Sequence, residues 1–266
     1  ATDVDSLDVG DPVYCDQYVE DEKDGNYAFA GNFKLSADSG PLLAQWPDGA
    51  MATHLQLPVE CLTNVSPALR ITSSDTLCRL GWFGTAYGAF QKVNLKPGQT
   101  IAILGATGLV GSSAVLVALA MGVQKVVAVG RSPEKLQALL ELDPRVEIAQ
   151  EVPHCIDVVL STMDSDDPIW LQQAAECLNR FGSIVTVASV NPCLSLSDLV
   201  TRDLTIRGSL WFERSAPGRL VDMIADGALK VDKIKSQAFS LDNVADALQT
   251  AALGSTPFEQ VVVNPN

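Results

Sequence analysis

The sequence is most constrained by one stretch, Thr100-Ile-Ala-Ile-Leu-Gly105-Ala-Thr-Gly108-Leu-Val-Gly111. An apolar run there ends on three spaced glycines, and a second apolar run follows. A strand that turns straight into a helix around a dinucleotide needs such glycines. The first permits a tight turn, the second lets the backbone approach a pyrophosphate, and the third lets the helix pack closely on the sheet. The stretch therefore predicts a nucleotide-binding turn whose helix N–H groups bind the anion.

The residues after the glycines favour this interpretation over glycines placed for packing alone. Ser112 to Met121 is apolar almost all round, as in a helix buried against a sheet, and Gly122 is expected to end it. Lys125 to Val129 then supplies a second buried strand. The predicted cofactor-binding residues of the turn are Gly105, Thr107, Gly108, Leu109, Val110 and Gly111.

The end of the second strand indicates which dinucleotide binds. A unit that binds NAD is expected to carry an acidic side chain about 20 residues beyond the glycines, on the ribose hydroxyls. Here the tip is Gly130-Arg131-Ser132, with Lys135 one turn on, so a 2′-phosphate would meet two cations and no carboxylate at the tip. These four residues predict NADP(H). The alternative is that Ser132 only caps the helix opening at Pro133, and both roles are compatible.

Composition limits the class of protein. The 266 residues are 47% hydrophobic, enough for a sizeable core in one or two domains. A net charge of −14 would repel nucleic acid and anionic membranes, so neither is expected as a partner. Six cysteines without CxxC spacing indicate reduced thiols and a cytoplasmic location. No apolar run of roughly 18 residues and no basic signal-peptide start is seen.

From Thr100 onward, strand and helix patterns alternate with short joins, which predicts an α/β fold with a doubly wound parallel sheet. Helices are expected to open at Ser132-Pro133 and Asp167-Pro168, where an N-cap residue precedes proline. The predicted strands are Ile101 to Leu104, Val126 to Val129, Asp157 to Leu160, Ser183 to Ala188, Leu204 to Leu210 and Phe258 to Val263.

The two ends of the chain differ from this pattern. The first hundred residues are rich in Gly, Pro, Asp and Asn, so their strands should be short and irregular, and Ser36 to Gly49 is predicted as a loop. Near the C-terminus a helix is expected from Leu241 to Leu253. Its predicted core-facing side chains are Leu241, Val244, Leu248 and Ala252.

Several short motifs occur in a fixed order. They are Gly10-Asp11-Pro12-Val13, Gly49-Ala-Met-Ala-Thr-His54, Gly84-Thr85-Ala86-Tyr87, the glycine turn, Thr205-Ile-Arg-Gly208 and Phe258-Glu-Gln-Val-Val-Val. From about Val9 to the C-terminus the chain thus resembles the alcohol-dehydrogenase-like medium-chain dehydrogenases/reductases. The resemblance implies a partial GroES-like β domain at 1–80 and a Rossmann domain at 81–230. Residues 231–266 would be a helix and strand that return to the substrate domain and sheet.

Two departures from the family matter for function. Zinc-dependent members carry a cysteine ligand six residues before the tyrosine of the Thr-Ala-Tyr motif, where this chain has Gly81, and no cysteine quartet for structural zinc is present. No metal is therefore expected. The segment before Gly10-Asp11, which bears much of the family's substrate pocket, is almost missing. Either the chain is a remnant of a longer protein or its cleft is unusually open.

The resemblance assigns roles to further residues. Thr85 should lie near the nicotinamide at the cleft floor, and Tyr87 either donates a hydrogen bond or fills the interdomain seam, so these are the predicted catalytic residues. Ser161 and Thr162 either line the adenosine and ribose or cap the next turn.

The ends of the later strands should meet the ligand at the switch point of the sheet. Ala188, Ser189, Leu210 and Trp211 are expected there, with Trp211 as a pocket wall or as interface packing. A homodimer through the Leu204 to Leu210 strand is implied by the family. His54 and His154 are expected to be structural or exposed.

The sequence thus predicts a zinc-independent, NADPH-dependent oxidoreductase that transfers hydride to a carbonyl or activated alkene of a small organic substrate. The proton would come from water or an unidentified hydroxyl. Two alternatives stay open: a catalytically silent NADPH-binding protein, and a subunit whose pocket is completed by a partner chain.

Overall fold

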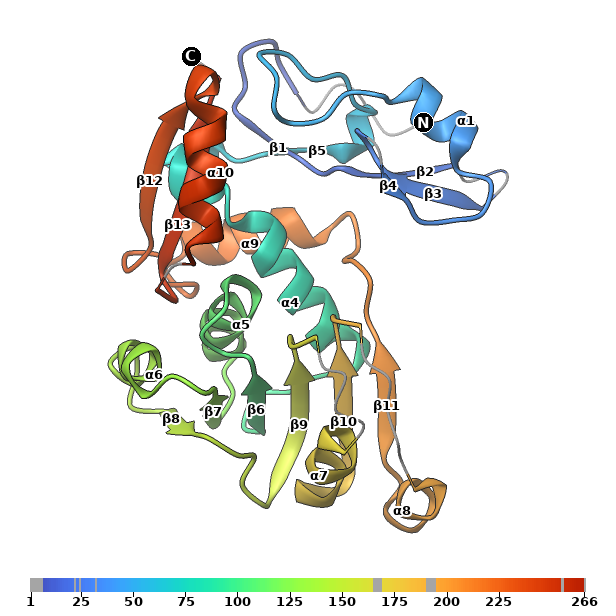
Figure 1. The fold of residues 1–266 in the computed structure, drawn as a ribbon, viewed down its shortest axis with the longest axis vertical. Coiled ribbons are helices and arrows are strands. Elements are labelled where there is room, and N and C mark those ends of the chain that lie inside the picture. The colour runs from blue at the N-terminus through green and yellow to red at the C-terminus, as the bar shows by residue number, and fades with distance from the viewer. Residues whose placement is uncertain are drawn as a thin grey trace.

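The computed structural model describes residues 7–21, 23, 25–31, 33–164, 169–189, 195–254 and 256–265, with backbone alone at 33 and 34. Its centre is a six-stranded parallel sheet of order β11-β10-β9-β6-β7-β8 (Figure 1). The chain winds outward from β6 in both directions, so the predicted doubly wound Rossmann sheet is confirmed. The strands are β6 (Thr100–Leu104), β7 (Lys125–Val129), β8 (Val146–Ala149), β9 (Ile156–Ser161), β10 (Leu178–Thr186) and β11 (Thr205–Gly208).

Helices connect and cover these strands. The predicted cap of α6 is confirmed, because the hydroxyl of Ser132 accepts a hydrogen bond from the backbone N–H of Lys135. The predicted start at Asp167-Pro168 lies outside the described residues, and the helix is seen from Trp170. The helices are α4 (Leu80–Lys92), α5 (Leu109–Ala120), α6 (Pro133–Leu140), α7 (Trp170–Cys177), α8 (Leu196–Arg202) and α9 (Ala216–Ala225).

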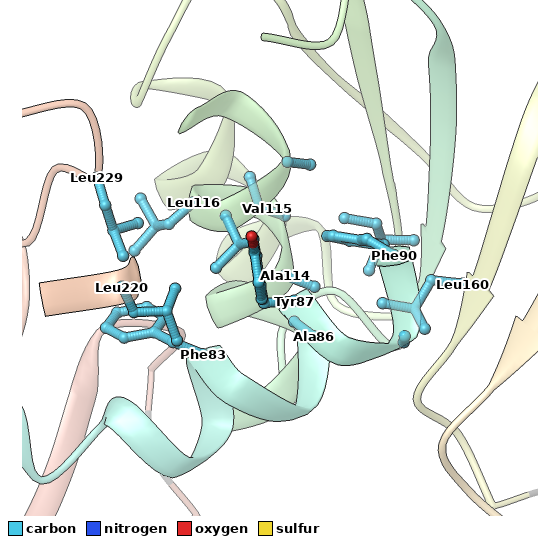
Figure 2. Close-up of a cluster of buried hydrophobic side chains, with 14 of the residues drawn as sticks. Phe83, Ala86, Tyr87, Phe90, Ala114, Val115, Leu116, Leu160, Leu220 and Leu229 are labelled. Carbon is cyan, nitrogen blue, oxygen red and sulfur yellow. The ribbon is translucent and has the colours of Figure 1, made fainter. Parts of the chain in front are cut away.

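The main core lies where α4 packs across α5 (Figure 2). Tyr87 of α4 lies beside Ala114 and Val115 of α5, and Phe83 of α4 lies beside Leu220 of α9. The helix α5 is buried in this cluster along most of its length, which explains why it is apolar nearly all round. Each fully buried aromatic or aliphatic side chain of this kind stabilises the fold by about 1.5–3 kcal/mol. The remaining labelled members are Ala86, Phe90, Leu116, Leu160 and Leu229.

The N-terminal part has short strands, as expected. β1 (Val13–Cys15) pairs with β5 (Leu62–Asn64), and β2 (Tyr18–Asp21), β3 (Asn26–Phe29) and β4 (Phe33–Lys34) form an antiparallel sheet. Short helices complete this part of the chain: α1 (Gly40–Gln45), η2 (Val59–Cys61), α2 (Ser66–Leu69) and α3 (Ser74–Leu77).

Helix α1 shows that the prediction of a loop at Ser36 to Gly49 is wrong. Pro41 stands in its first turn, a position that suits proline, and Leu42 is buried beside Val19 and Ala28. Burial of one leucine on the small sheet outweighed the local turn signals.

The C-terminal unit corrects two further predictions. β13 (Glu259–Asn264) does not extend the large sheet but pairs in parallel with β12 (Lys235–Ser240). The chain connects the two strands by η3 (Leu241–Asn243) and α10 (Val244–Ala252). Figure 1 shows this unit and the N-terminal strands on opposite sides of α4. Leu248 is 60% exposed and Ala252 is exposed, so the expected core face of α10 is wrong there. A helix that packs on a sheet of only two strands buries few of its side chains, and in α10 the buried one is Ala247.

Arg79 joins three distant parts of the chain. Its Nε donates to Ser113 Oγ at 2.9 Å, and its Nη2 donates to Ser112 Oγ at 2.5 Å and to the Pro257 carbonyl at 2.7 Å. The side chain is fully buried, and the described part of the chain places no carboxylate in an ion pair with it. Burial lowers the pKa of Arg79 to about 10, so the buried group remains a cation at neutral pH.

Arg79→Ala should lower the free energy of unfolding by about 3 kcal/mol, because the Pro257 carbonyl and two serine hydroxyls lose a charged donor and a cavity opens. Urea denaturation followed by circular dichroism measures the change. Arg180→Ala is the control: it removes an exposed ion pair with Asp203 and should cost less than about 1 kcal/mol. Equal losses for the two variants would contradict the structural role of Arg79.

Candidate cofactor and substrate site

Two of the three glycines are required by the geometry of the turn itself. Gly105 has φ +75°, and a Cβ on it would lie 2.7 Å from Thr162 Oγ1. A Cβ on Gly111 would overlap the Gly105 carbonyl and lie 2.7 Å from the Cα of Ala106. The first glycine therefore makes the turn, and the third lets α5 approach it.

Gly108 differs, because nothing in the protein requires glycine there. It is the exposed N-cap of α5 with extended backbone, and a Cβ on it would meet only the Gly105 carbonyl, at 3.5 Å. The space beside it is open at the end of the helix where unpaired N–H groups of Leu109 and Val110 attract anions. The turn thus fits a pyrophosphate.

A cavity of about 450 Å³ opens beside this turn, lined in part by Leu104, Val129, Gly130, Arg131 and Met163. These residues lie at or just beyond the carboxyl ends of β6, β7 and β9, where open α/β sheets bind ligands. Arg131 is exposed at its rim, and Lys135 is exposed in the first turn of α6. Glu151 and Glu176 line the same cavity, so its lining carries both signs of charge, and its position fits the adenosine end of a dinucleotide.

Thr107 and Ser132 shape the tip next to Arg131. A Cβ on Gly130 would lie 3.4 Å from Thr107 Cγ2, so the glycine keeps the turn and the strand end in contact. Glu134 places one carboxylate in the same helix turn as Lys135. The structure brings Thr107 next to the tip at Gly130.

The hydroxyls after β9 bind the protein itself. Thr162 Oγ1 donates to the Leu104 carbonyl at 2.8 Å, and Ser161 Oγ accepts from the Met163 N–H at 3.4 Å. Both hydroxyls therefore follow the capping alternative, and Thr162 supports the glycine turn.

The residues after β10 and β11 are arranged by local contacts. The N–H of Ala188 donates to Thr186 Oγ1, and that of Ser189 donates to Asp164 Oδ1. β11 ends at Gly208, two residues before its predicted end, and Leu210 is 51% exposed.

A second hollow, of about 740 Å³, lies between the N-terminal segment and α4. Tyr14, Cys78, Gly81, Trp82 and Trp211 are among its lining residues. Trp211 thus walls a pocket, and it also joins the two parts, because its Nε1 donates to Asp16 Oδ1 at 2.9 Å and its ring stacks on Phe212. Whether Trp211 also packs at an interface with a second copy stays a prediction.

Glycines on α4 allow this arrangement. A Cβ on Gly84 would lie 2.6 Å from Phe212 Cδ1, and a Cβ on Gly88 would lie 2.8 Å from Phe212 Cβ. Phe212 can therefore press directly on the helix backbone and carry Trp211 into the hollow.

The predicted catalytic residues separate in space. Thr85 is half-buried one turn beyond Gly81, whose carbonyl accepts its hydroxyl at 2.9 Å. Tyr87 is buried in the core between α4 and α5 and is absent from the described lining of either hollow (Figure 2). Its position fits the packing alternative and not a hydrogen bond to substrate.

The two histidines and three residues that no sequence motif marked complete the description of both sites. His54 and His154 are exposed, as expected, although His154 borders the smaller cavity. No motif marks Tyr14, Asp16 or Trp82, although the spacing of Tyr14 and Asp16 puts them on one side of an extended segment.

The described residues contain neither a candidate metal site nor a disulfide bond. Five cysteines there are free, two of them buried, while Cys193 lies outside those ranges. No group of three His, Cys, Asp or Glu among the described residues could hold a metal ion. Zinc independence stays a prediction. Within the same part of the chain, no helix is long and apolar enough to cross a membrane.

Comparisons with known proteins agree with this geometry. Residues 110–226 match the family model for zinc-binding dehydrogenases. The chain is 25% identical to sorbitol dehydrogenase of Bacillus subtilis over 251 residues, covering 89% of this chain and 69% of that protein. It is 26% identical to the quinone oxidoreductase-like protein 2 homolog of Nematostella vectensis over 226 residues, covering 76% and 60%.

Solved structures show the same fold. 2R,3R-butanediol dehydrogenase from Bacillus subtilis matches with a TM-score of 0.76 at 19% identity, covering 98% of this chain and 75% of that one. Alcohol dehydrogenase TADH from Thermus sp. ATN1 matches with a TM-score of 0.78 at 23% identity, covering 97% and 79%. With the sheet order and the glycine turn, these matches make the chain similar in sequence and fold to medium-chain dehydrogenases/reductases.

Gly108→Val should weaken dinucleotide binding roughly 100-fold, about 2.7 kcal/mol, while leaving the melting temperature nearly unchanged. A Cβ at 108 would make only an ordinary van der Waals contact, 3.5 Å from the Gly105 carbonyl, so the fold should tolerate the substitution. Calorimetric titration with NADPH and thermal unfolding measure the two effects.

Gly111→Ala is the contrasting variant, since its methyl would overlap the Gly105 carbonyl and should lower the melting temperature. Undiminished NADPH binding by Gly108→Val would show that the pyrophosphate lies elsewhere.

Proposed function

We propose that this chain is a zinc-independent, NADPH-dependent oxidoreductase that transfers hydride to a carbonyl or activated alkene of a small organic substrate. The observation that carries the proposal is the open space at Gly108, at the N-terminus of α5. Glycine there serves no internal packing need, so its use is best explained by a ligand backbone that comes close.

Named relatives support the reaction class. Acryloyl-coenzyme A reductase of Metallosphaera sedula, 28% identical over 156 residues, is named for an alkene substrate, whereas alcohol dehydrogenase 1 of Emericella nidulans, 32% identical over 165 residues, is named for alcohols. The chain spans 46% of each of these proteins. Both substrate classes therefore remain within the proposal.

The preference for NADPH rests on Arg131. Its guanidinium stands at the carboxyl end of β7 beside a cavity that fits adenosine, with Lys135 in the following helix turn. A planar, permanently charged fork suits a 2′-phosphate, and no carboxylate occupies the tip itself. One neighbouring solved structure, acetophenone reductase from Geotrichum candidum, is described in complex with NAD, at 20% identity and a TM-score of 0.58.

In this mechanism the chain mainly binds and orients. N–H groups at the start of α5 would hold the pyrophosphate, and the half-buried Thr85 lies one turn beyond Gly81, which lines the larger hollow. The dihydronicotinamide, when bound, supplies the hydride. Trp211 and Tyr14 wall the space in which a substrate would be oriented and shielded from water.

A homodimer through β11 is part of the proposal. β11 is an edge strand of the large sheet, and Thr205, Arg207 and Gly208 are exposed on it. Its unpaired backbone groups could pair with a second copy.

Arg131→Asp should weaken NADPH binding about 10- to 100-fold while changing NADH affinity little, because a charge-assisted hydrogen bond to the 2′-phosphate becomes a repulsion. Calorimetric titration with both nucleotides measures this. Lys125→Asp makes the same charge change at the amino end of β7 and serves as control. Equal affinities of the native protein for NADPH and NADH would contradict the preference.

A panel of aldehydes, ketones, enones and quinones, followed at 340 nm, tests catalysis in the same samples. NADPH binding without oxidation of any of them would favour a silent or partner-completed protein.

A further inference from the structure

The hydroxyl of Tyr14 lies against the backbone of α4 at Gly81. An ideal Cβ on Gly81 would be 3.2 Å from Tyr14 Oη, so a larger residue at 81 would crowd the hydroxyl. Tyr14 and Gly81 both line the hollow of about 740 Å³ between the N-terminal segment and α4. The absence of a side chain at 81 thus gives the hydroxyl a place at the wall of the hollow.

Tyr14 is the one hydroxyl-bearing side chain among the described residues that line this hollow. The structure records no hydrogen bond from its hydroxyl to another described residue, which leaves the group available to a ligand. The other lining groups able to release a proton are Cys15, Cys78 and the exposed Asp48. Burial raises the pKa of both thiols, so they too hold their protons at neutral pH.

Two interactions hold Tyr14 in place. Its backbone is in β1, paired with Thr63 of β5, and its ring packs on the main core. Asp16, two residues on, accepts hydrogen bonds from Trp211 Nε1 at 2.9 Å and from the Tyr18 N–H at 3.0 Å. Because side chains two residues apart in an extended segment point to the same side, these hydrogen bonds of Asp16 also fix the side to which the Tyr14 side chain points.

The hydroxyl of Tyr14 carries its proton at neutral pH. Burial raises the pKa of Tyr14 above its ordinary value, and the nearby Asp16 and Cys15 raise it further. The phenol is therefore protonated at neutral pH and can give a proton but cannot serve as a resting base.

We propose that Tyr14 is the proton donor of the reductase, a catalytic residue that protonates the substrate oxygen as hydride arrives. The inference rests on the proposed function. A C–H bond would form at the carbonyl carbon with the electron pair of the C–H bond that breaks at C4 of the dihydronicotinamide, and the carbonyl π pair would move onto oxygen. The Tyr14 O–H bond breaks and its proton goes to that oxygen, after which the tyrosinate takes a proton from water. The dihydronicotinamide is the reductant and leaves oxidised.

Tyr14→Phe in the full-length protein tests this, with 4-nitrobenzaldehyde and 9,10-phenanthrenequinone as probes and NADPH followed at 340 nm. An alkoxide needs a proton donor, so kcat for the aldehyde should fall about 100-fold or more, with KM changed less than about threefold. A quinone yields a far less basic oxygen anion, and its reduction should keep most of its rate. The solvent deuterium isotope effect on aldehyde reduction should disappear with the hydroxyl.

Controls separate chemistry from structure. Tyr18→Phe removes a hydroxyl from a nearby tyrosine that does not line the hollow and should leave both activities unchanged. The NADPH dissociation constant and melting temperature of Tyr14→Phe should match those of the native protein.

The outcomes are distinct. If native protein reduces the aldehyde and Tyr14→Phe reduces it equally well, Tyr14 is not the donor although the proposed function stands. A parallel loss of aldehyde and quinone reduction would assign Tyr14 a structural role and overturn the inference. If native protein oxidises no NADPH with either probe, the proposed function fails and the inference fails with it.

Discussion

The close approach of other segments to α4 is the constraint on which the rest of the structure depends. Gly84 and Gly88 let Phe212 lie on the helix backbone, and Gly81 does the same for the Tyr14 hydroxyl. The opposite side of α4 carries the aromatic residues that pack on α5. One helix therefore holds the N-terminal strands, the segment after β11 and the nucleotide-binding turn in a fixed relation.

Buried polar contacts give this packing its specificity. Trp211 could stack on Phe212 in several orientations, but its bond to Asp16 selects one. Arg79 likewise brings the carbonyl of Pro257 to the first turns of α5, and with it the β12–β13 unit. A buried polar group without its partner is costly, so each such bond disfavours alternative arrangements of the parts.

The sequence predicted the elements whose signals are local. β6, β7 and β9 are continuous apolar runs, and α6 begins with Ser132 before proline, so strand positions and cap were found. β8 and β12 were not predicted, because Val146 to Ala149 and Lys235 to Ser240 mix charged and apolar residues without a clear period. Each of these strands has a single neighbour in its sheet, so pairing, more than burial, defines it.

The candidate site divides in the same way. Gly105, Gly108 and Gly111 could be assigned from spacing, and Arg131 from its place after a strand, since backbone shape and helix ends are local properties. Tyr87 could not be placed so, because the same helix offers one face to the core and another to the hollow. Only the packing of α4 on α5 decided that Tyr87 is buried and that Gly81 lines the cleft.

The sequence by itself therefore determined the parallel sheet and the nucleotide-binding turn, since periodicity, glycine spacing and caps act within a few residues. Tertiary structure alone decided which side chains face the larger hollow. The bonds that shape it join residues 195 positions apart at Asp16 and Trp211, and those that hold the C-terminal unit join residues 178 apart at Arg79 and Pro257. Contacts over such separations depend on how whole elements pack, and no local pattern in the chain records them.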